Sequence, residues 1–124
     1  GAAVAPLATA LADPDPCVRR MAALKLGRMR DPRGMDALRA ALASADAGQR
    51  ATGALGLGYS EDPAAIDALG GALDDASSEV RAAATWALGE IEDARAIPLL
   101  IPVLGEDEDP AVRQVAAWAL GEIE

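Results

Sequence analysis

Apolar residues recur at helical spacing along the whole 124-residue chain. In residues 80–91 they stand three or four positions apart, which places them on one side of a helix. They are Val80, Ala84, Ala87, Leu88 and Ile91. A short acidic turn follows, and residues 97–104 then give a second apolar series. The pattern therefore predicts pairs of short helices joined by polar turns.

Asp-Pro pairs mark the expected helix starts, because Asp is a favoured N-cap and Pro is favoured in the first helical turn. These pairs begin at Asp15, Asp31, Asp62 and Asp109. Pro102 lies inside the expected helix after residue 97, where it removes a backbone hydrogen bond, so we expect a kink there.

The pairs of helices form a repeat. Its arginines are separated by 31, 31 and 32 residues, and each is followed eight residues later by glycine. The arginines are Arg19, Arg50, Arg81 and Arg113, and the glycines are Gly27, Gly58, Gly89 and Gly121. A period of this length predicts an all-α solenoid of stacked antiparallel helix pairs. We expect a single domain, residues 1–124, with units at about 2–30, 32–61, 63–92 and 94–124.

Composition narrows the function. The net charge is −9, which argues against nucleic acid as a partner, and no apolar run is long enough to predict a membrane span. The first 50 residues carry eight Lys/Arg and five Asp/Glu, whereas the rest carry three and fifteen. The two ends of the solenoid should therefore have opposite fields. A single cysteine, Cys17, predicts a reducing compartment, for which we expect the cytoplasm.

The chain has no histidine, so it has no Ser-His or Cys-His pair and no imidazole metal site. We therefore predict a protein that is not an enzyme, with no catalytic residue, no cofactor and no metal. The first residue is Gly1 rather than Met, which suggests a tag remnant or a piece of a longer protein.

The segment "SSEVRAAATWALGEIEDARAIPLLIPVLGEDEDPAVRQVAAWALGEIE" resembles HEAT repeats of the phycobilisome-lyase-like subclass, and the resemblance covers the whole chain. It implies a right-handed superhelix with the Val-Arg helices on the concave side. It also implies a structural ladder between each arginine and the Asp six residues before it. The pairs are Asp13–Arg19, Asp75–Arg81 and Asp107–Arg113, while Arg50 has Ser44 at that place. The alternative use of these arginines is an anion site. Deoxyhypusine hydroxylase has similar repeats, but that likeness implies His-Glu pairs, which are missing here.

Large apolar side chains are expected opposite the core side of the Val-Arg helices. This stripe, with its polar neighbours, is our candidate protein-binding site. It comprises Leu24, Leu55, Tyr59, Trp86 and Trp118, together with Met21, Arg28, Glu90 and Glu122. Contiguous exposed apolar residues mark interaction surfaces. The alternative is that each tryptophan lies flat on the neighbouring helix.

The leading hypothesis is a scaffold module that binds a protein or peptide along its concave face. Alternatives are an accessory subunit of a bilin-lyase-like assembly and a connector segment of a longer HEAT-repeat protein. The last helix keeps the internal pattern, with no polar substitution at core positions such as Val112 and Ile123. We therefore expect a homodimer or further repeats through it. The second unit, with Gln49 for valine and several glycines, is expected to be the softest.

Overall fold

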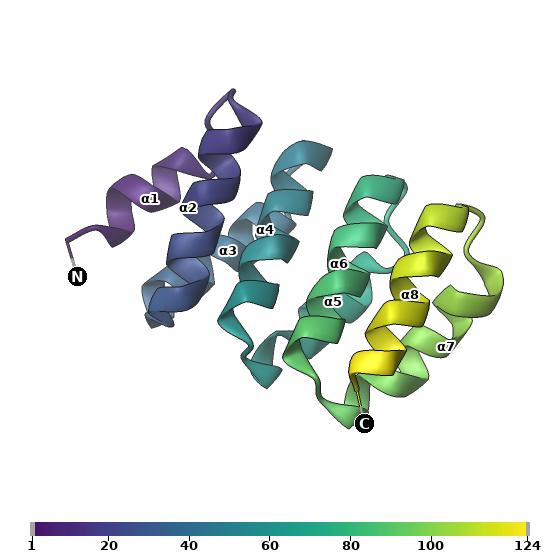
Figure 1. The fold of residues 1–124 in the computed structure, drawn as a ribbon. Coiled ribbons are helices and arrows are strands. Elements are labelled where there is room, and N and C mark those ends of the chain that lie inside the picture. The colour runs from purple at the N-terminus through teal and green to yellow at the C-terminus, as the bar shows by residue number, and fades with distance from the viewer. Residues whose placement is uncertain (1, 124) are drawn as a thin grey trace.

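The computed structural model describes residues 2–123, which form helices stacked side by side (Figure 1). The α-helices are α1 (Val4–Ala10), α2 (Pro16–Met29), α3 (Pro32–Leu42), α4 (Ala47–Ser60), α5 (Ile66–Ala72), α6 (Ser78–Ile91), α7 (Ile97–Glu106) and α8 (Pro110–Glu122). Short 3-10 helices, η1 (Pro63–Ala65) and η2 (Ala94–Ala96), precede α5 and α7. The described residues contain no strand, and the predicted all-α solenoid is confirmed.

The helices begin where the Asp-Pro pairs predicted. Asp15, Asp31 and Asp109 are N-caps of α2, α3 and α8, and each side chain accepts the backbone N–H two residues later. Asp62 does the same at η1. Pro102 lies inside α7, and the helix continues past it to Glu106.

The helices form two rows. Consecutive members of the inner row (α2, α4, α6 and α8) pack against each other closely, whereas those of the outer row (α1, α3, α5 and α7) approach one another much less. In Figure 1 the inner row lies in front, and α3, α5 and α7 lie behind it. The closer spacing of the inner row means that the stack curves toward it. This is the row of Val-Arg helices that the resemblance placed on the concave side.

A continuous apolar core lies between the rows. Each helix from α2 to α7 contributes one fully buried leucine: Leu26, Leu38, Leu57, Leu69, Leu88 and Leu100. The equivalent residue of α8, Leu120, is only partly buried, because no helix of residues 2–123 packs over its far side. The core is therefore complete between units and open at the last one.

Candidate functional site

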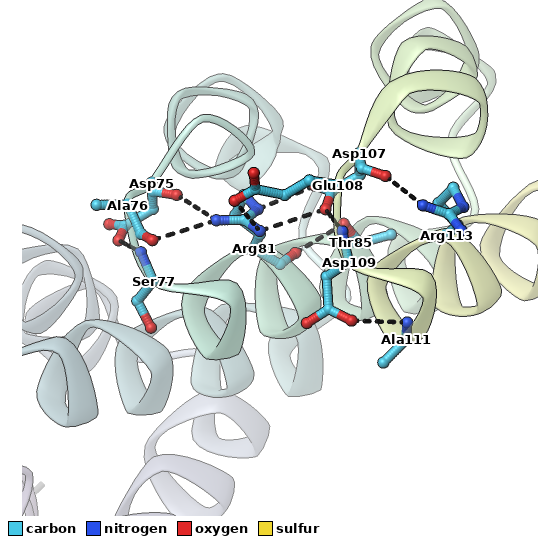
Figure 2. A network of polar contacts seen from close by, with 10 residues as sticks. All are labelled: Asp75, Ala76, Ser77, Arg81, Thr85, Asp107, Glu108, Asp109, Ala111 and Arg113. Carbon is cyan, nitrogen blue, oxygen red and sulfur yellow. Dashed lines mark hydrogen bonds and ion pairs between the residues drawn. The ribbon is translucent and has the colours of Figure 1, made fainter.

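The arginine ladder joins neighbouring units. Arg81 on α6 donates through Nε and Nη2 to the two carboxylate oxygens of Asp107, at 2.9 and 3.3 Å. Asp107 lies in the turn between α7 and α8, so this pair ties the third unit to the fourth. Toward its own unit, Arg81 donates through Nη1 to the backbone carbonyl of Asp75, at 2.9 Å. Figure 2 shows Arg81 between Asp75 and Asp107.

The predicted pairing of carboxylates within a unit is therefore wrong. Asp13 and Asp107 offer their backbone carbonyls to Arg19 and Arg113, as Asp75 does to Arg81, and their carboxylates take no part in those bonds. The interval of six residues corresponds to the hydrogen bond between the arginine and a backbone carbonyl, which a residue of any type can accept. The carboxylate contact spans 25 or 26 residues, and that recurring interval was the signal in the sequence.

Arg50 and Arg19 exchange roles relative to the prediction. Arg50, expected to lack a partner, forms a bidentate pair with Asp75 at 2.8 and 3.1 Å. Among the arginines that face a following unit within residues 2–123, Arg19 lacks a carboxylate partner, because the residue that would face it is Ser44. The Nε atom of Arg19 is buried and has no hydrogen-bond partner. The missing rung thus lies between the first two units.

The ladder perturbs its carboxylates. The hydrogen bond from Arg50 lowers the pKa of Asp75 below the ordinary value of an aspartate side chain. Burial by itself would raise the pKa of Asp107, but hydrogen bonds from Arg81 and from the N–H of Asp109 outweigh it and lower that pKa as well. Both carboxylates are therefore charged at neutral pH, and their ion pairs stabilise the contacts between neighbouring units.

The tryptophans of the candidate stripe pack across the seams between inner-row helices. A Cβ built on Gly58 would lie 2.7 Å from Cζ3 of Trp86, and one built on Gly89 would lie 2.6 Å from Cζ3 of Trp118. Each ring therefore covers the glycine of the preceding unit. Trp86 is partly buried, whereas Trp118 keeps 38% of its surface exposed. The stripe is more embedded than its position opposite the core predicted.

Three members of the stripe form a cluster across three helices. The Tyr59 and Trp86 rings meet edge to face, with centroids 5.2 Å apart and an interplanar angle of 69°. The guanidinium carbon of Arg28 lies 6.0 Å from the Tyr59 centroid, at the limit of a cation–π contact. The helical spacing predicted that these residues share one face, but it did not predict that the cation and the two rings are in contact. The cluster links α2, α4 and α6.

Beyond Trp86 the face becomes acidic. Burial raises the pKa of Glu90, and the negative charges of Glu61, Glu122 and Glu92 raise it further. The inner row thus changes from a cation at Arg28, through aromatic rings, to a group of carboxylates at α6 and α8.

The remaining candidates of the stripe differ in exposure. Met21 is 54% exposed, Glu122 is exposed, and Leu24 and Leu55 are intermediate. Within residues 2–123, no three potential ligand side chains of His, Cys, Asp or Glu converge as a metal site would require. None of the described helices has both the length and the apolar character needed to cross a membrane.

The family profile described as HEAT repeats matches residues 2–55 and 36–121. The chain belongs to the HEAT-repeat family. No curated protein sequence matches it.

The solved structures that resemble it over nearly its whole length include two that are described by name. A chain of the complex of CpcE and CpcF of phycocyanin lyase from Nostoc sp. PCC7120 is 27% identical, with a TM-score of 0.76. Human deoxyhypusine hydroxylase is 26% identical, with a TM-score of 0.75. The alignments cover 94% and 96% of this chain, but only 52% and 42% of the two structures. The HEAT-repeat protein therefore spans about half the length of either relative.

Proposed function

We propose that this HEAT-repeat chain binds a protein or peptide along the inner row. The observation that carries the proposal is the Arg28–Tyr59–Trp86 cluster, which crosses three helices and is continued by the partly exposed Trp118. A few residues supply most of the binding energy in protein interfaces, and Trp, Tyr and Arg are enriched among them. Similarity to a chain that is solved as a complex of two proteins is consistent with this proposal.

The charge of the face defines the chemistry of the partner. A segment lying across the inner row would meet the aromatic rings first and then the carboxylates of Glu90 and Glu122. Burial is the main cause of the raised pKa of Glu90, and the negative charges of Glu61, Glu122 and Glu92 add to it. We therefore propose a partner segment with apolar anchors followed by Lys or Arg toward α8.

The test uses Trp118→Ala and Trp86→Ala, after the partner has been recovered by pull-down from the source cell and identified. Each substitution should weaken affinity by about 2 kcal/mol, or about thirtyfold, if its ring is a binding hot spot. The two tryptophans of the chain both lie in the stripe, so intrinsic fluorescence reports binding directly.

Leu99→Ala, on the outer row, is the matched control and should retain wild-type affinity, because Leu99 is an exposed apolar residue outside the stripe. Thermal melting separates lost binding from lost folding, and Trp118→Ala is the sharper variant since Trp118 is the more exposed ring. Wild-type affinity of a folded Trp118→Ala protein, with partner contacts confined to the outer row, would contradict the proposal.

A second candidate is an accessory role in pigment attachment, which the 27% identity to the phycocyanin-lyase complex favours. An absorbance shift on adding a bilin, lost in Trp86→Ala, would support this role. An unchanged bilin spectrum together with partner binding would exclude the role in pigment attachment and support the protein-binding function.

A further inference from the structure

The C-terminal flank of the stack, formed by α7 and α8, exposes residues whose equivalents in the third unit are buried. In the third unit, Thr85 and Leu88 are fully buried and Gly89 is buried. Their equivalents one unit later are Ala117, Leu120 and Gly121, of which Ala117 and Gly121 are exposed and Leu120 is intermediate. Leu104 on α7 is 40% exposed, whereas its equivalent Leu73, at the C-cap of α5, is 8% exposed. The last unit therefore presents an internal joint surface to solvent.

The guanidinium group of Arg113 is held like that of Arg81, in the position from which an arginine pairs with a carboxylate of the next unit (a rung of the ladder). Its Nη1 donates to the backbone carbonyl of Asp107 at 2.7 Å, as Arg81 donates to Asp75 (Figure 2). Among residues 2–123, no carboxylate lies within ion-pairing distance of Arg113. Its Nε and Nη2, which in Arg81 hold the next unit, have no protein acceptor in this part of the chain. The flank thus combines an apolar face with one unfilled carboxylate position.

The N-terminal flank offers the matching carboxylate. Oδ1 of Asp13 accepts the N–H of Asp15 at 2.9 Å, the turn that also holds the rung carboxylates of Asp75 and Asp107. Within residues 2–123, no Arg or Lys pairs with Asp13. Its carboxylate is therefore held in the geometry of a rung acceptor without an arginine.

Apolar residues of α2, the first inner-row helix, are also exposed where their equivalents in later units are buried. Val18 is 40% exposed, whereas its equivalents Val80 and Val112 are 0% and 1% exposed. Met21 is 54% exposed, whereas its equivalent Ala83 is 7% exposed. Both flanks of the stack are thus joint surfaces that face solvent.

Charge selects how two such flanks meet. Arg28, Tyr59, Glu90 and Glu122 occupy equivalent positions in the four units and follow one another along the inner row. Arg28 lies against Tyr59. The pKa of Glu90 is raised mainly by burial, then by the charge of Glu61 and then by that of Glu122, so Glu122 lies close to Glu90. Continuing this column into a second copy places Glu122 beside the partner's Arg28, and Arg113 opposite the partner's Asp13. A two-fold dimer of C-terminal flanks would instead bring like charges together.

We propose that copies of this chain associate head to tail, with the C-terminal flank of one against the N-terminal flank of the next. Arg113 holds Asp13 of the next copy as Arg81 holds Asp107. Such a contact joins two different surfaces, so it is heterologous and extends into a filament rather than closing as a dimer. Lys25 replaces the small residues Gly56, Ala87 and Ala119 at this seam, which makes the joint weaker than the internal ones and dependent on ionic strength.

The experiment measures the weight-average mass of the 124-residue chain by sedimentation and light scattering over a range of protein and salt concentrations. We expect the mass to rise past that of a dimer with concentration and to fall with salt. Gly121→Leu should block assembly: a Cβ at Gly121 meets nothing within 4 Å in the single chain, whereas one at Gly27, Gly58 or Gly89 would collide with the next unit.

Gly71→Leu is the matched control, because Gly71 also has open space around it but lies on α5, away from both flanks. It should assemble as the wild type does. Gly121→Leu should raise the apparent dissociation constant at least tenfold, with circular dichroism unchanged.

A charge exchange tests the Arg113–Asp13 contact itself. Arg113→Asp alone and Asp13→Arg alone should each be monomeric, because like charges then meet at the joint. An equimolar mixture of the two variants should assemble again, since every joint in an alternating filament regains opposite charges. A wild-type chain that stays monomeric, assembly that stops at a dimer unaffected by Gly121→Leu, or a mixture of folded variants that does not reassemble would overturn the proposal.

Discussion

Arg81 and Asp107 are 26 residues apart, yet they form a bidentate ion pair whose side chains are 10% and 7% exposed. The pair connects the middle of one unit to the turn of the next, and Arg50 with Asp75 repeats it one unit earlier. Each unit of a solenoid contacts only its neighbours, so the stability of the stack depends on the contacts between adjacent units. The Arg81–Asp107 pair strengthens one of those contacts.

Replacing Asp107 with Asn should lower the free energy of unfolding by about 3 kcal/mol at neutral pH. The substitution leaves the Arg81 guanidinium largely buried without its counter-charge, and breaking one partner of a buried pair is costly. Urea denaturation measures the change. Glu108→Gln is the control, since Glu108 is 89% exposed and lies 3.8 Å from Arg81, so it should change stability little.

The same carboxylates should make the stack sensitive to acid. Asp75 and Asp107 have pKa values below 3.8 in the folded chain, so the unfolded chain takes up protons first as the pH falls. Their stabilising contribution is therefore complete above the unfolded pKa and is lost as the pH falls through the folded value. Melting between pH 5 and pH 2 should show a smaller loss in Asp107→Asn than in the wild type. Equal losses would mean that Asp107 is not a source of the acid sensitivity.

Ser44→Asp should supply the missing rung to Arg19. Ser44 already accepts the N–H of Asp46 through Oγ at 3.1 Å, so an Asp side chain can keep the turn while facing the unpartnered Nε of Arg19. We expect about 1–2 kcal/mol of added stability. Amide exchange of residues 46–73, predicted to be the fastest in the stack, should slow. In an Arg19→Lys background, which removes the forked donor, the gain should disappear; a gain that persisted there would exclude the rung as its cause.

Gly89→Ala should destabilise the chain although alanine is the better helix former. An added Cβ would lie 2.6 Å from the Trp118 ring and 2.9 Å from Cα of Ala119, so α6 and α8 would have to move apart. Such overpacking costs about 1–3 kcal/mol. Gly121→Ala is the matched control and should be neutral or stabilising by up to about 1 kcal/mol, because its surroundings are open. Thermal melting at low protein concentration compares the two, and an equal gain in both would disprove the close approach at Gly89.

Glu90→Gln should stabilise the chain at pH 7 by up to about 1 kcal/mol. Burial and three neighbouring carboxylates raise the pKa of Glu90 above the ordinary value of a glutamate side chain, so its charged form is disfavoured in the folded state. Protonated Glu90 favours the folded state. This contribution is complete below the pKa that Glu90 has in the unfolded chain, and it is lost as the pH rises through the pKa that Glu90 has in the folded chain. The difference between variant and wild type should therefore vanish near pH 4. A difference independent of pH would show that charge is not its cause.

The sequence by itself determined the helices, their order and the period of the stack. Helical spacing of apolar residues and Asp caps act within one or two turns of chain, so Asp15, Asp31 and Asp109 predicted helix starts without knowledge of the fold. The resemblance carried by the repeated Val-Arg pattern also identified the family.

Only the tertiary structure decided which groups meet across the joints. Asp13 and Asp75 were predicted to pair through their carboxylates with the arginine of their own unit, but those arginines take the backbone carbonyls instead. The guanidinium fork then points along the stack, and its partner depends on the distance and rotation between units. The distance and rotation between units depend on how closely the next helix packs against Gly58 and Gly89. The spacing of residues along the sequence does not specify that packing.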